Sequence, residues 1–378
     1  MWNSRAGKLF IAAAVLVVLI GIAFRFVGSG PKQSSNSPTT LNEIAERRQL
    51  STSTPRSSRE SPPSEEGATP AEDELAKFLA LKLPREKIEE YLRLHNRDAA
   101  SLLAAFHASG DAEHMAGDIN YLKEAATNFP NDPHVQRTVL AQNAFPEERR
   151  KWLDAFKESS PSNSLAGYLS ARDYFKSGQP DAAIKEMLAA SGKSQFENYG
   201  METMLGEEEL YRFSGKSPIE VHEAAMSAMA TDLSSELLSF KALSQDIEGL
   251  QKQYLTAQDA SSAQNLAEMG LVLSARLSGG ESAKLVINQL VGIAIEAASL
   301  RQLDQNTACD FLGGKTPKER SDELKQQRAS MRALMQERND FFPKMTETER
   351  LSFIDRQRLY GELEAARWLR QRYGMTAP

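Results

Sequence analysis

From residue 69 onward the chain reads as a succession of helices, and no segment alternates apolar and polar positions in the way that a half-buried strand does. Explicit start signals punctuate this pattern. At four positions a hydroxyl residue is followed three residues later by glutamate, so that each can cap a backbone amide of the other: Thr69, Ser217, Thr316 and Thr346. The pattern therefore predicts an all-α body.

One stretch near the start is different because it is almost purely apolar. Residues 9–24 carry no charge, and a helix over residues 9–27 would measure roughly 28 Å at about 1.5 Å per residue, enough to span a bilayer core. We predict a single transmembrane helix at residues 9–27, after a short basic N-terminus at residues 1–8. A cleaved signal peptide is the alternative, since Arg5 and Lys8 precede the stretch and small residues follow it.

Residues 28–68 are rich in serine, proline, threonine and glycine and contain few large apolar side chains, too few to offset the entropy of ordering. We predict a disordered linker with an end-to-end distance of about 35 Å. Arg5 and Lys8 favour a cytoplasmic N-terminus, which places the body outside the cytoplasm, with a bacterial periplasm favoured.

An aromatic-x-x-Ser-Gly pattern recurs in the first part of the body. It begins at Phe106, Tyr174 and Tyr211, and in each case it is expected to end one helix and start a turn. The distance along the chain between the first two patterns is about twice the roughly 34-residue period of helix-turn-helix repeats. This indicates an intervening unit with its turn near Ala144. Pro130 and Pro161 would separate successive units.

These hairpins resemble the tetratricopeptide repeat family over about residues 98–230. In the best unit the family's small, aromatic, turn and bulky positions are occupied by Ala171, Tyr174, Gly178, Ala183, Met187 and Ala190. Residues 69–230 are therefore expected to form a helical repeat region, because a single hairpin cannot bury its own apolar face and consecutive hairpins stack.

The resemblance implies a curved surface, lined by the first helix of each hairpin, that binds a protein or peptide. Aligned on the family, that surface would present His134, Gln142, Tyr168, Arg172, Phe175, Lys176 and Arg212. The alternative for Tyr168 and Phe175 is that they are ordinary core aromatics, since aromatic residues at helical spacing are mostly packing residues.

Beyond residue 230 the repeat signal fades, and residues 231–378 are expected to form a separate C-terminal helical region. We predict one long helix from Glu281 to Leu303 and two further helices at residues 318–341 and 346–373. The last two mix arginine and lysine with glutamate, a mixture typical of solvated faces with pairs four residues apart.

Charge and cysteine content exclude several kinds of site. The 51 acidic and 45 basic residues give a net charge of −6, which argues against nucleic acid as a partner. The single cysteine, Cys309, excludes a disulfide within the chain and a thiolate zinc cluster.

No catalytic, cofactor or metal site is recognised in the sequence. His222 and Glu223 begin like a zinc-protease helix, but Met226 stands where the second histidine is needed. Gly314, Lys315 and Thr316 resemble the end of a phosphate loop, but an earlier glycine is missing. The acidic run at residues 207–209 is expected to be a solvated helix face.

We therefore predict a membrane-anchored, noncatalytic scaffold that uses helical repeats to bind another protein or peptide, in a cell-envelope assembly and without a cofactor. Two alternatives stay open. One is an enzyme with an active site dispersed over residues 231–378, and the other is a structural or oligomeric component of the envelope.

Overall fold

The computed structural model describes residues 82–109 and 117–374, and every regular element in these two ranges is a helix. This confirms the predicted all-α body. The predicted basic N-terminus, transmembrane helix, linker and Thr69 cap lie outside the described residues. Within the described ranges no helix is both long and apolar enough to cross a membrane.

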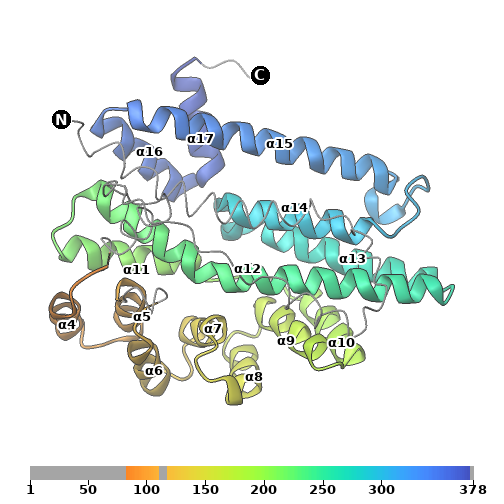
Figure 1. The fold of residues 1–378 in the computed structure, drawn as a ribbon, viewed down its shortest axis with the longest axis horizontal. Coiled ribbons are helices and arrows are strands. Elements are labelled where there is room, and N and C mark those ends of the chain that lie inside the picture. Colours follow the sequence, from red (N-terminus) through yellow and green to blue (C-terminus); the bar gives the residue numbers. More distant parts are fainter. Residues whose placement is uncertain (1–81, 110–116, 375–378) are drawn as a thin grey trace, which may run out of the picture.

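The first part of the body consists of short helices that pack in consecutive pairs along one side of the long helix α12 (Figure 1). Helix α4 comes first, and α5 pairs with α6, α7 with α8, and α9 with α10. The bounds are α4 Arg85–Leu94, α5 Ala99–Ala108, α6 Ile119–Asn128, α7 Pro133–Gln142, α8 Arg149–Ser159, α9 Leu165–Lys176 and α10 Pro180–Ser191.

Helix α12, Pro218–Thr256, organises the whole body. Its 39 residues extend roughly 58 Å at about 1.5 Å per residue. It packs against α5, α7 and α9 on one side and against α13, α14 and α16 on the other, while α11, Gly200–Phe213, lies alongside it (Figure 1). It runs without interruption through residues 230 and 231, so the repeat region and the C-terminal region share this helix.

The remaining helices lie on the far side of α12 (Figure 1). Helices α13 and α14 pack closely together, and α15 packs on α14 and α17. The bounds are α13 Ala260–Leu277, α14 Val286–Leu300, α15 Pro317–Phe341, α16 Glu347–Tyr360 and α17 Glu362–Arg372.

The local signals that fall on described residues are found where they were expected, while Gly110, the glycine of the first aromatic-x-x-Ser-Gly pattern, lies outside them. Full capping boxes start α12, α15 and α16 at Ser217, Thr316 and Thr346. Gly178 and Gly215 follow α9 and α11 with positive φ angles of 72° and 83°, a conformation that glycine adopts without strain. These features are correct because they depend only on residues adjacent in the chain.

Two expected helices were wrong in extent. The stretch from Glu281 to Leu303 begins as a 3₁₀ turn, Gly280–Lys284, and becomes α-helical only over α14. The stretch from 346 to 373 is broken at Gly361, which has a φ of 90°. A Cβ atom at that position would stand 2.7 Å from the Cα atom of Lys284, so this glycine permits a backbone contact between distant parts of the chain.

Three apolar clusters hold these layers together. The largest joins α4–α14 and contains most of the buried apolar side chains. A second cluster lies between α14, α15 and α17, and a third connects α16 and α17. The C-terminal helices therefore pack on the same structure as the hairpins, through α12 and α14.

Candidate functional site

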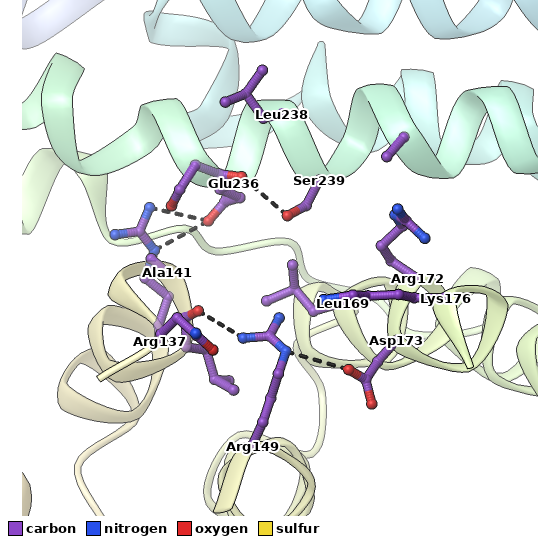
Figure 2. Close-up of a pocket in the computed structure, with 14 residues that line it drawn as sticks. Arg137, Ala141, Arg149, Leu169, Arg172, Asp173, Lys176, Glu236, Leu238 and Ser239 are labelled. Atoms are coloured by element: carbon purple, nitrogen blue, oxygen red, sulfur yellow. Dashed lines mark hydrogen bonds and ion pairs between the residues drawn. The ribbon is translucent and has the colours of Figure 1, made fainter. Parts of the chain in front are cut away.

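A pocket of about 350 Å³ lies between α7, α8 and α9 on one side and α12 on the other (Figure 2). Leucine and alanine side chains form part of its wall, and Leu238 on α12 is 47% exposed beside it. Four cationic and two carboxylate side chains also line it: Arg137, Arg149, Arg172, Lys176, Asp173 and Glu236. Such a mixed lining suits a ligand with both apolar and charged groups.

Arg149 on α8 ties two of the pocket's helices together. Its Nη1 atom donates to the carbonyl oxygen of Leu140 on α7 at 2.8 Å, and its Nε atom lies 3.3 Å from Oδ1 of Asp173 on α9. Figure 2 shows its guanidinium group reaching up between the two helices. Arg149 therefore holds the pocket's wall as well as contributing positive charge to it.

The pocket brings together two of the seven residues predicted to bind a partner. Arg172 and Lys176 lie one turn apart on α9 and both line it. Nη1 of Arg172 lies 3.2 Å from Oδ2 of Asp246 on α12. The spacing of four residues placed both side chains on one helical face, which is a local property that the sequence could predict.

The other five predicted residues do not line this pocket. Tyr168 is fully buried in the main apolar cluster, and half-buried His134 stacks on the ring of Tyr199 at 5.2 Å. Half-buried side chains are also found at Gln142 and Phe175, while Arg212 is exposed on α11, beside Glu208. Helix α12 also packs on the first helix of each hairpin, α5, α7 and α9, where an open surface was expected.

A buried ionic cluster closes the inner end of the pocket. Arg137 on α7 is fully buried and pairs with Asp232 and Glu236, one turn apart on α12. Its Nε atom donates to Oε2 of Glu236 at 3.1 Å, and its Nη1 atom donates to Asp232. Burial raises the pKa of Glu236 to about 6, against the opposing effect of Arg137. The cluster holds α7 against α12.

Two histidines extend this cluster towards α5 and α11. Nε2 of His107 lies 3.8 Å from Oδ1 of Asp232, and Nε2 of His134 lies 3.1 Å from Oγ1 of Thr203. Burial lowers the pKa of His107 to about 4 and lowers that of His134 in the same direction. Both are therefore neutral at pH 7. Since His107 and Asp232 are sealed in the core, their arrangement is that of a structural network.

The acidic run on α11 does not form the solvated face that was expected. Glu207 and Glu208 are buried, and only Glu209 is exposed. Burial raises the pKa of Glu207 well above its usual range, opposed by the nearby charge of Lys82. Burial also lowers the pKa of Lys82 to about 8. This burial is not visible in the sequence because the groups around the two carboxylates come from Lys82, α12 and α16, far away in the chain.

Glu208 joins three helices. Its Oε1 atom accepts hydrogen bonds from Nη2 and Nε of Arg358 on α16, at 2.6 and 2.9 Å, and lies 3.3 Å from Nδ1 of His222 on α12. These bonds lower the pKa of Glu208, although burial opposes them. His222, which begins the zinc-protease-like stretch, therefore has a structural partner.

The described residues contain no cluster of metal ligands. Within residues 82–109 and 117–374, no three histidine, cysteine, aspartate or glutamate side chains are arranged to hold an ion. The pocket's own carboxylates are instead paired with arginines, Asp173 with Arg149 and Arg150, and Glu236 with Arg137.

The chain matches no family model, no curated protein and no solved structure. Its function is therefore inferred from the geometry of the pocket and from the layout of the chain.

Proposed function

We propose that this protein is a membrane-anchored, noncatalytic helical scaffold, and that it binds a segment of another protein in the pocket between α7, α9 and α12. The pocket itself carries the proposal. It combines an exposed leucine, Leu238, with two cationic side chains on adjacent turns of α9, Arg172 and Lys176. Exposed apolar groups beside charged groups are characteristic of sites that receive a partner's side chains.

The arrangement of the helices supports a scaffold role. Three helix pairs in a row pack on one continuous helix, and the groups on the pocket's wall come from four different helices. Residues fixed by a rigid framework lose little conformational entropy when a partner binds. The predicted transmembrane helix and linker would keep this pocket within a few tens of ångströms of the bilayer.

The proposal can be tested by copurification of the full-length chain from solubilised membranes. Ala242→Trp places a large side chain in the pocket, and Leu238→Ala removes its exposed apolar group. Leu359→Ala on α16 is the control, because Leu359 is 64% exposed and does not line the pocket. We expect the two pocket variants to lose a bound protein that the wild type and Leu359→Ala both retain.

An identical set of copurified proteins for all four chains, each shown to be folded by its thermal unfolding, would exclude the pocket as a partner site. Purified partner and chain should then be mixed to measure the dissociation constant directly. The expected loss for Ala242→Trp is at least about tenfold, since one occluding side chain removes several contacts together.

A further inference from the structure

We infer that the pocket recognises an acidic peptide segment, with a glutamate or aspartate side chain against Arg172 and Lys176 and a neighbouring apolar side chain against Leu238. This inference rests on the proposed function and names the chemistry of the partner. Some of the pocket's charged side chains already have adequate partners within the protein, and others do not.

Lys176 has no adequate partner within the described chain. It lies at the exposed end of α9 and makes neither an ion pair nor a hydrogen bond with any described residue. A lysine on a pocket wall normally extends into water unless an anion holds it. Its ammonium group is therefore available to a carboxylate that enters the pocket.

Arg172 is only partly satisfied. Its one described partner is Asp246, whose Oδ2 atom lies 3.2 Å from Nη1, yet this oxygen is buried without a hydrogen bond. The contact is thus an ion pair without good hydrogen-bond geometry. Guanidinium groups bind carboxylates best through two parallel hydrogen bonds, and Arg172 has the donors left to form them.

Arg150 on α8 is an example of an arginine whose guanidinium group is fully bound by neighbouring side chains. It donates to Oγ of Ser170 at 2.7 Å and to Oδ2 of Asp173 at 2.6 Å, and its guanidinium carbon lies 4.1 Å from the ring centroid of Tyr174. Arg150 does not line the pocket, whereas the less satisfied Arg172 does. Arg172, which has donors to spare, therefore lies on the pocket wall, while the fully engaged Arg150 lies off it.

The inner end of the pocket shows the same imbalance. Nη2 of fully buried Arg137 and Oε1 of Glu236 have no hydrogen-bond partner among the described residues, and neither has Oγ of Ser235. Unpaired buried polar atoms are costly. These three atoms are themselves closed off from solvent, so a ligand that enters the pocket meets Arg172 and Lys176 and does not reach them.

A carboxylate on a peptide fits the pocket better than a lone inorganic anion does. Four cationic and two carboxylate side chains line the pocket, so an incoming negative charge meets more attraction than repulsion. Charge alone therefore favours an anion of either kind, and the apolar part of the wall distinguishes them. Leu169 and Leu238 add an apolar wall that a lone inorganic anion would leave uncovered.

The test uses two fluorescent peptides of the same length, one alternating leucine with glutamate and the other alternating leucine with glutamine. Binding to the full-length chain in detergent is followed by fluorescence anisotropy. We expect the glutamate peptide to bind at least about tenfold more tightly, because hydrogen bonds between charged groups are the strong ones. This preference should shrink as salt is added.

Matched double variants assign the effect to the pocket. In Arg172→Gln with Lys176→Gln we expect the glutamate peptide to lose about tenfold in affinity, with the glutamine peptide unaffected. The control is Arg301→Gln with Lys185→Gln, which removes one arginine and one lysine, both exposed and outside the pocket. It should bind the glutamate peptide like the wild type.

Equal affinity of the two peptides, binding of neither peptide, or equal losses in the two double variants would overturn the acidic-partner inference. The Ala242→Trp chain separates that failure from failure of the proposed function. Suppose that the acidic-partner inference has failed in this way. If Ala242→Trp then abolishes binding of both peptides or loses the membrane partner, the pocket binds peptides without regard to charge. If it changes neither peptide binding nor copurification, the proposed function fails as well.

Discussion

Arg137 on α7 and Glu236 on α12 form a buried ion pair, with Nε of the arginine donating to Oε2 of the glutamate at 3.1 Å. The arginine is fully buried and the glutamate is 2% exposed. Asp232, one turn earlier on α12, accepts from the same guanidinium group. The single cation of Arg137 on α7 therefore pairs with two carboxylates on α12. These ion pairs set the position of α7 beside the pocket.

Replacing Arg137 by methionine would leave Asp232 and Glu236 buried without their cation. Removal of one partner of a buried pair costs about 3–5 kcal/mol, so we expect Arg137→Met to lower the free energy of unfolding by about that amount in urea titrations. Arg301→Gln is the control, since it breaks an exposed pair with Glu248 and should cost less than about 1 kcal/mol. Similar losses for the two variants would contradict this prediction.

Acid is expected to destabilise the protein through His107. The pKa of His107 falls from 6.5 in the unfolded chain to about 4 in the folded protein because the side chain is buried. Between these values the unfolded chain binds more protons, so stability is present above pH 6.5 and is lost as the pH falls towards 4. The loss is on the order of 3 kcal/mol, at about 1.4 kcal/mol per unit.

Glu236 acts in the opposite direction, since its pKa is raised from 4.5 to about 6 and the folded protein takes up that proton first. The effects of His107 and Glu236 on stability can be distinguished by urea titrations at several pH values between about 7 and 5. We expect the His107→Gln chain to lose less stability on acidification than the wild type, and Glu236→Gln to lose more. An unchanged pH slope in both variants would exclude this cluster as the source.

Arg358→Gln should loosen the C-terminal helices from α11. It removes the two hydrogen bonds of 2.9 and 2.6 Å to Glu208 and leaves that buried carboxylate to His222 and to the more distant, exposed Arg212. Hydrogen bonds to charged groups contribute about 1.5–3 kcal/mol, so faster amide hydrogen exchange is expected in α16. Arg367→Gln, which breaks an exposed pair with Glu364, should leave the exchange of α16 unchanged. Equal exchange in both variants would count against the role of Glu208.

Gly361→Ala should destabilise the protein by at least about 2 kcal/mol, because alanine is strained at a φ of 90° and its Cβ atom would collide with the backbone of Lys284. Gly249→Ala is the matched control. A Cβ atom at Gly249 meets no other atom within 4 Å, and this position lies inside α12, so alanine there should be neutral or stabilising by up to about 1 kcal/mol. Thermal unfolding of the two variants measures both changes in stability, the expected loss in Gly361→Ala and the neutral or stabilising effect in Gly249→Ala.

Part of the candidate site could be predicted from the sequence. Arg172 and Lys176 share a face of α9 because they are four residues apart, and both were assigned to a binding surface. The residues of α12 that line the same pocket, Glu236 and Leu238, could not be predicted. They lie more than fifty residues further along the chain, and nothing local to α9 indicates that α12 passes over it.

The sequence by itself determined the helical character of the body and the starts of its long helices. Ser217, Thr316 and Thr346 cap their helices, and Gly178 and Gly215 end theirs, because caps and turns depend on a few adjacent residues.

Only the tertiary structure decided which helical faces are covered. Tyr168 became a core residue, and Glu207 was buried in place of facing solvent. The pocket exists because α12 lies across two neighbouring hairpins, α7–α8 and α9–α10. The physical reason is that burial and ion pairing depend on groups brought close together from distant parts of the chain, whereas helix formation depends on hydrogen bonds between residues four apart.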